Sequence, residues 1–199
     1  MSLVPVLSSR SLKSFVLCAA ILAGGCDRQS GAESQPQASQ GASEALPGAL
    51  GAEVITGGLD RSYKGAAIPA VTAKDGKGNA LDLASLKGKP FLLNLWATWC
   101  APCIAELPTL DALHKGGTLR VVAVSQDLSA PEKVAPFLKS HDAPNLEPWI
   151  EQAADLSFAY GGNLPITVLF GSDGKEVWRW TGGNEWDSPE AMKLLAEAK

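Results

Sequence analysis

The sequence predicts an α/β fold in which helices cover both faces of a mixed β-sheet. Two observations lead to this prediction. Strand-like and helix-like segments alternate between residues 65 and 199, and a tight turn joins the last two strand-like segments, which makes them antiparallel. A segment of about 135 residues is long enough for one domain with a single hydrophobic core.

The first half of this domain contains a hairpin, a strand and a helix. The turn sequence over 74–79 interrupts residues 68–83, so we expect an N-terminal β-hairpin. A short apolar run predicts a buried strand over 90–97. A helix is expected over 100–114, because two glycines follow it.

The second half begins with a buried strand over 119–125. Ser129 and Glu132 are spaced as a capping box, which predicts a helix that ends near residue 140. The remaining elements are a strand over 164–170, a turn over 172–175, a strand over 176–180, and a helix that starts at Ser188.

The first 25 residues are typical of an export signal. Arg10 and Lys13 precede an apolar run over 15–23 that is too short to span a bilayer. Small residues then lead to Cys26 and resemble a bacterial lipobox, so we expect residues 1–25 to be removed and Cys26 to be lipidated. This predicts an anchor on the periplasmic side of the inner membrane. An ordinary cleaved signal would give a soluble periplasmic protein, and an uncleaved signal would itself be the anchor.

Residues 26–64 are expected to form a flexible tether between that anchor and the domain at 65–199. Much of this stretch is Gln, Ser, Gly, Ala and Glu, with few large apolar side chains. Such a composition buries too little surface to offset the loss of chain entropy on folding.

The cysteines predict redox chemistry rather than a disulfide-stapled scaffold. The chain has four cysteines; Cys18 would leave with the signal and Cys26 would carry lipid, so Cys100 and Cys103 would be the only thiols of the mature protein. Cys100 lies at a strand-to-helix junction, where helix N–H groups and the helix dipole stabilise a thiolate. The sequence disfavours a zinc site in which these two cysteines supply half of the ligands, because zinc takes four ligands and there is no second Cys-x-x-Cys motif.

Several segments together resemble the thioredoxin family, and in particular its exported TlpA/ResA/CcmG branch. The resemblance covers residues 59–196 and is closest to TlpA around residues 60–62 and 185–188. It rests on the stretches 94–103 (Asn-Leu-Trp-Ala-Thr-Trp-Cys-Ala-Pro-Cys), 106–108 (Glu-Leu-Pro), 164–165 (Leu-Pro), 173–175 (Asp-Gly-Lys) and 182–186 (Gly-Gly-Asn-Glu-Trp). It implies a thioredoxin-like fold with an N-terminal hairpin extension.

We expect Cys100 to be the nucleophile and Cys103 the resolving thiol, because Cys100 is the more exposed thiol at the helix start. In related redox proteins the two residues between the cysteines tune the stability of the thiolate, and we expect Pro102 also to contact the substrate. The resemblance implies that Pro165 is cis and lies against the disulfide, leaving the backbone of Leu164 free to pair with a substrate chain.

Glu106 follows Cys103 by one helical turn and is a candidate proton relay, with a pKa raised by partial burial. The alternative interpretation is that Glu106 is an ordinary helix glutamate exposed to solvent, without a role in the chemistry. Asn94 stands where thioredoxins carry a buried aspartate, and an amide cannot take that proton. We expect Trp99 to form an apolar rim for protein partners and Trp96 to lie in the core, and we expect no chemical role for Trp186.

These features predict a thiol-disulfide oxidoreductase that reduces disulfides in partner proteins and needs no cofactor. The resemblance implies clients in cytochrome oxidase copper-site assembly or cytochrome c biogenesis, and re-reduction by a membrane reductant of the DsbD/CcdA kind. We expect a monomer. No Lys/Arg cluster suggests nucleic acid, and the formal net charge is a modest −4.

Two other functions are considered. A copper-binding or transfer module could use both thiolates, but the copper chaperones of this fold also use a distal histidine, and His141 does not lie just ahead of Pro165. A thiol peroxidase would need a proline and a hydroxyl residue at set distances before the reactive cysteine, where this chain has Leu93 and Ala97.

Overall fold

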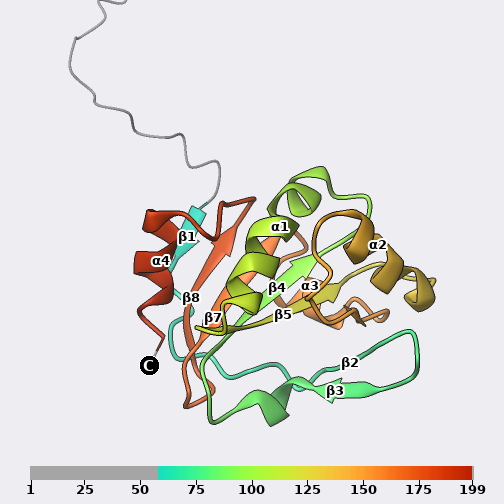
Figure 1. Cartoon of the computed structure of the whole chain (residues 1–199). Coiled ribbons are helices and arrows are strands. Elements are labelled where there is room, and N and C mark those ends of the chain that lie inside the picture. The colour runs from blue at the N-terminus through green and yellow to red at the C-terminus, as the bar shows by residue number, and fades with distance from the viewer. Residues whose placement is uncertain (1–57, 199) are drawn as a thin grey trace, which may run out of the picture. The chain divides into compact units, whose positions relative to one another are not determined.

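The structure is a computed structural model that describes residues 58–198 (Figure 1). The predicted signal, Cys26 and residues 26–57 of the predicted tether lie outside the described residues. The described residues form a mixed eight-stranded sheet in the order β1-β8-β7-β4-β5-β6-β2-β3. Its strands are β1 (Gly58–Asp60), β2 (Thr72–Lys74), β3 (Ala80–Asp82), β4 (Phe91–Trp96), β5 (Arg120–Ser125), β6 (Trp149–Ile150), β7 (Ile166–Phe170) and β8 (Glu176–Thr181).

Strand β4 is the centre of the sheet and runs parallel to β5 and antiparallel to β7. All six of its residues are buried, as a strand covered on both faces requires. Side chains alternate between the faces, so Leu92 and Trp96 join one core cluster whereas Leu93 and Leu95 join the other. The predicted antiparallel pairing of β7 with β8 is confirmed.

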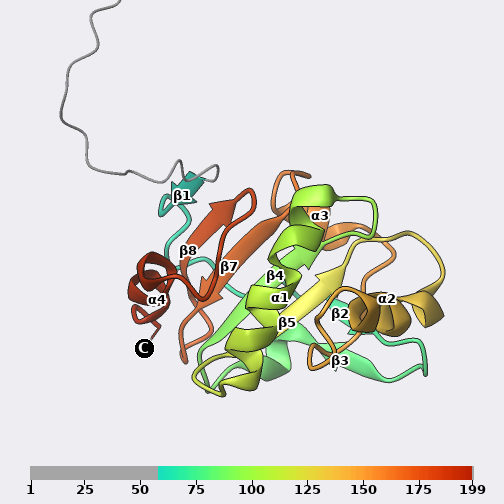
Figure 2. The ribbon, with the colours of Figure 1, turned by 45° about the horizontal axis from the view of Figure 1, so that its top comes forward.

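Helices cover both faces of the sheet (Figures 1 and 2). Apolar residues of α1 (Ala101–Lys115), α2 (Val134–Ser140) and α4 (Pro189–Leu195) pack into the cluster that contains Leu92 and Trp96. The short helix α3 (Asp155–Ala159) and the 3₁₀ turn η1 (Leu83–Leu86) pack on the opposite face. The thioredoxin-like α/β fold predicted from the sequence is therefore present, including the N-terminal hairpin of β2 and β3.

Strand β1 shows that the folded domain begins before residue 65, where we expected the tether to end. Residues Gly58–Asp60 pair antiparallel with β8, with Leu59 opposite Trp180. Farther along this segment, the guanidinium of Arg179 lies 3.5 Å from the ring centroid of Tyr63. A three-residue strand has no hydrophobic periodicity of its own, and it forms because β8 offers a free sheet edge.

The predicted capping box at Ser129 and Glu132 is wrong. Ala130 is in the left-handed region with φ 60°, and a 3₁₀ turn, η2 (Pro131–Lys133), precedes α2 with no capping side chain. The start of α4 is as predicted, because the Ser188 side chain accepts a hydrogen bond from the backbone N–H of Ala191 at 3.2 Å.

Candidate functional site

The two thiols of the predicted redox pair lie where β4 gives way to α1. Cys100 is the N-cap residue of this 15-residue helix and has extended backbone angles, and its side chain makes no capping hydrogen bond. Pro102 lies in the first turn, where its missing N–H costs no helical hydrogen bond. The unpaired N–H groups and the helix dipole therefore favour negative charge on the Cys100 sulfur.

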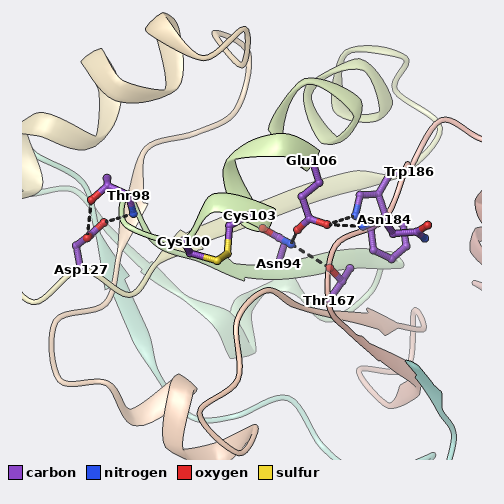
Figure 3. Close-up of a disulfide and its surroundings, with 9 residues drawn as sticks. All are labelled: Asn94, Thr98, Cys100, Cys103, Glu106, Asp127, Thr167, Asn184 and Trp186. Carbon is purple, nitrogen blue, oxygen red and sulfur yellow. Dashed lines mark hydrogen bonds between the residues drawn. A yellow bond between two sulfur atoms is a disulfide. The ribbon is translucent and has the colours of Figure 1, made fainter. Parts of the chain in front are cut away.

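Cys100 and Cys103 form a disulfide with an S–S distance of 2.01 Å and a Cα–Cα distance of 5.3 Å (Figure 3). Cys100 retains 6% exposure whereas Cys103 has 0%, so an incoming sulfur reaches Cys100 first. This difference in exposure agrees with the higher exposure that we expected for Cys100. The neighbouring Trp99 is 71% exposed, which is the position expected for an apolar rim.

The peptide bond between Leu164 and Pro165 is cis, as the family resemblance implied. Pro165 is buried and Leu164 is half-buried just before β7. Within residues 58–198, no hydrogen bond uses the backbone N–H or C=O of Leu164. These two groups are therefore available to pair with an added strand.

Glu106 is buried, with 2% exposure, and is not a solvated helix glutamate. Its Oε1 accepts a hydrogen bond from Asn94 Nδ2 at 2.7 Å. Its Oε2 accepts from the Trp186 Nε1–H at 3.0 Å and from the Asn184 backbone N–H at 3.1 Å (Figure 3). Cys103 and Glu106 are three residues apart on α1, so their side chains share one face of the helix.

Burial raises the pKa of Glu106 from its ordinary value of 4.5 to about 7, although the three hydrogen bonds act in the opposite direction. A carboxyl group with this pKa accepts and releases a proton at neutral pH, which suits a general acid or base. Asn94 Nδ2 also donates to Thr167 Oγ1 at 2.9 Å, and its Oδ1 is buried without a partner. An Asn94 amide turned by 180° would present that oxygen to a protonated Glu106.

Trp186 contacts the titratable group directly, a role that the sequence analysis missed. Its ring is fully buried and stacks parallel to Trp178 at 6.2 Å. The loop that carries it approaches the redox motif, because a Cβ atom built on Gly183 would lie 3.4 Å from the carbonyl oxygen of Pro102. The motif over 182–186 was recognised, but nothing in its residue types shows that an indole N–H faces a carboxylate 80 positions away.

The residues considered for metal binding or peroxidase chemistry either make other contacts or are buried. His114 Nδ1 accepts from the Val121 backbone N–H at 3.3 Å, and the His141 ring stacks on Phe137 at 4.0 Å. Among residues 58–198, no group of three or more His, Cys, Asp and Glu side chains is placed to hold a metal ion. Leu93 and Ala97 are both buried. In the same range, none of the helices has the length and apolar character needed to cross a membrane.

Comparison with known proteins agrees with this geometry. The family model for redoxins matches residues 63–195. The chain belongs to the redoxin family. It is 30% identical to the thiol-disulfide oxidoreductase ResA of Bacillus cereus over 139 residues, which cover 66% of this chain and 79% of ResA. It is 32% identical to the thiol:disulfide interchange protein CycY of Rhizobium leguminosarum over 124 residues, or 61% of this chain and 65% of CycY.

A solved structure supports the fold. A putative thiol:disulfide interchange protein DsbE from Chlorobium tepidum superposes with a TM-score of 0.56 at 24% identity, covering 67% of this chain and 96% of that one. This redoxin is therefore a thiol-disulfide oxidoreductase of the TlpA/ResA/CcmG branch, with Cys100 and Cys103 as its Cys-x-x-Cys pair.

Proposed function

We propose that this redoxin reduces disulfides of partner proteins from the periplasmic side of the inner membrane, with Cys100 as nucleophile and Cys103 as resolving thiol. The observation that carries the proposal is the Cys100–Cys103 pair at the start of α1 beside Glu106, a buried carboxyl group with a pKa of about 7. A purely structural disulfide needs neither a proton acceptor nor a thiol at a helix N-terminus.

The proposed reaction has two displacements. The Cys100 thiolate attacks one sulfur of the client disulfide, forms a mixed disulfide and releases the other client sulfur as a thiolate. Glu106 then accepts the Cys103 proton, and the Cys103 thiolate attacks the Cys100 sulfur and releases the second client thiolate. The client gains two electrons, the redoxin is left oxidised with a new Cys100–Cys103 disulfide, and both client thiolates take up protons.

Leu164 and Trp99 would hold the client during these steps. The free backbone groups of Leu164 would pair with an extended client segment, and Trp99, which is 71% exposed, would cover its apolar side chains. Pro165, cis and buried in this loop, keeps Leu164 in position.

The clients that we propose are proteins whose paired cysteines must be reduced before they bind metal or haem: the copper-site proteins of cytochrome oxidase, or apocytochrome c. A membrane dithiol reductant of the DsbD/CcdA kind would return two electrons to the Cys100–Cys103 disulfide. Lipid on Cys26 would keep the domain close to such membrane partners and so raise their effective concentration. Radiolabelled palmitate should enter the wild-type protein and not a Cys26→Ser variant; equal labelling of both would refute the anchor.

Trapping in the host tests the client assignment. A Cys103→Ser variant cannot resolve the mixed disulfide, so it should accumulate joined to its clients through Cys100. Recovery of copper-site or haem-site apoproteins, absent from a Cys100→Ser control, supports the proposal. If the variant traps nothing and Cys100 does not react with an alkylating agent at neutral pH, the proposal is wrong.

A further inference from the structure

The loops around the disulfide carry acidic side chains and no basic ones. We define the redox edge as the segments 97–100, 126–130, 151–165 and 182–188, which follow β4, β5, β6 and β8. We propose that the redox edge selects clients whose disulfide lies in a basic and apolar segment. This inference rests on the proposed function and specifies the class of substrate that the same site takes.

The charge of the redox edge is one-sided. Its segments contain five carboxylates and no Lys, Arg or His, and the carboxylates are Asp127, Glu151, Asp155, Glu185 and Asp187. Two of these accept internal hydrogen bonds, Asp127 from Thr98 and Glu151 from the backbone N–H of Ala153. The other three are exposed, and in the described part of the chain none of the three forms a salt bridge.

Hydrogen bonds and packing tie these segments to the redox motif. The Asp127 carboxylate accepts from both the backbone N–H and the hydroxyl of Thr98, two residues before Cys100 (Figure 3). Helix α3, with Asp155, is bound to the end of β5 because the Ser157 N–H donates to Gln126 Oε1 at 3.1 Å. The loop with Glu185 and Asp187 approaches Pro102 at Gly183 and Glu106 at Asn184.

The redox edge also gathers the most exposed large apolar side chains. Phe158 is 81% exposed, Trp99 71% and Leu128 70%, and all three lie on redox-edge segments. The next most exposed large apolar side chain in the described chain, Tyr63, is 50% exposed and lies in the N-terminal segment. Exposed apolar groups collected at one place mark a surface that binds another molecule.

The opposite edge of the sheet has the reverse charge. The segments 87–90, 115–120 and 171–175 lie where β4 and β5 begin and where β7 turns into β8. They contain one carboxylate, Asp173, and five basic residues: Lys87, Lys89, Lys115, Arg120 and Lys175. The segment 142–148 before β6 lies at the same edge and adds Asp142 and Glu147, the latter paired with Arg120, so basic residues still outnumber carboxylates there. The domain therefore has an electric dipole whose negative end is the redox edge, and this field would turn the disulfide toward an approaching basic client.

The occupant that fits these features is an extended client segment with a disulfide flanked by Lys or Arg and by apolar side chains. The Leu164 backbone pairs with the segment, the apolar side chains cover its hydrophobic residues, and the carboxylates attract its cations. A cation beside the client cysteines also lowers their pKa, and a thiolate of lower pKa leaves faster. The same field repels the redox edge of a second copy of this chain.

Two matched peptides test this selectivity. They share one intramolecular disulfide and one sequence, except that two flanking positions are Lys in one peptide and Glu in the other. Reduced protein is mixed with each peptide, and the second-order rate constant is measured from the peptide thiols that appear. At low salt we expect the Lys peptide to react about tenfold faster or more, and the ratio should fall toward one in high salt.

Variants locate the effect on the molecule. The triple variant Asp155→Asn, Glu185→Gln, Asp187→Asn should lose most of the preference for the Lys peptide. The matched control Lys87→Gln, Lys89→Gln at the opposite edge should keep it. Equal rates for the two wild-type reactions, a faster Glu peptide, or a preference that survives the triple variant would overturn the inference while leaving the proposed function standing. Reduction of neither peptide would overturn both.

Discussion

A comparison of the wild type with Glu106→Gln tests the raised pKa of the carboxyl group beside the disulfide. The quantity compared is the pH dependence of the free energy of unfolding. Burial raises the pKa of Glu106 from 4.5 in the unfolded chain to about 7 in the folded protein. The folded state therefore binds the proton more tightly, and the free energy of unfolding falls as the pH rises through the window from 4.5 to 7. At about 1.4 kcal/mol for each tenfold difference in proton affinity, the total loss is about 3 kcal/mol above pH 7.

The assay is denaturant unfolding of the oxidised protein at a series of pH values from 4.5 to 8.5, with wild type and Glu106→Gln compared at each. All other titrating groups are common to both proteins, so they cancel in the difference. Glutamine also changes the hydrogen bonds with Asn94, but that change does not vary with pH. We expect the wild type to lose about 3 kcal/mol relative to the variant between the two ends of the series. Parallel curves would refute the raised pKa and with it the role of Glu106 as proton acceptor.

Three further substitutions test individual contacts. Trp186→Phe removes an N–H donor that stabilises the charged form of Glu106, so the pH at which the loss of stability levels off should move above 7, whereas Trp180→Phe should leave it unchanged because that buried indole N–H has no partner. An equal shift of this upper limit in both variants would show a packing effect. Ser188→Ala removes the N-cap of α4 and should cost about 1 kcal/mol in thermal or denaturant unfolding, with no loss refuting the cap. Asp111→Ala removes a buried carboxylate that accepts three hydrogen bonds from the loop after α2 and should cost roughly 3 kcal/mol or more; a change under 1 kcal/mol would contradict these contacts.

The long elements could be predicted because each carries its own signal. Five of the six buried residues of β4 are large and apolar, with Asn94 as the exception, and α1 ends where Gly116 and Gly117 follow it. The hairpin of β7 and β8 has a turn sequence between two strand-like runs. Such local signals place an element whatever packs against it.

The short elements could not be predicted, because partners distant in sequence select them. Strand β1 exists where it pairs with β8, and the two-residue strand β6 exists where it lies beside β5. Ser129 and Glu132 have the spacing of a capping box, but the backbone at Ala130 turns left-handed and no cap forms. Spacing alone does not show which backbone angles the loop adopts.

The candidate site likewise has a part that could be predicted from local sequence and a part that depends on contacts between distant segments. Cys100, Cys103 and Glu106 are close in sequence on one helix, so their proximity follows from helical geometry. The bond from Trp186 to Glu106 spans 80 positions and depends on how the loop after β8 returns to α1. The one-sided charge of the redox edge was also hidden, because its carboxylates come from segments that meet only in the folded sheet.

The most direct test of the central claim is the thiol balance of a single turnover. Reduced protein is mixed with an excess of a disulfide-bonded protein, and the substrate thiols and the covalent intermediate are measured by mass spectrometry after acid quenching. We predict two substrate thiols for each Cys100–Cys103 pair oxidised, a stable mixed disulfide through Cys100 in Cys103→Ser, and neither product in Cys100→Ser. Substrate reduction by Cys100→Ser, or a mixed disulfide through Cys103, would contradict the account.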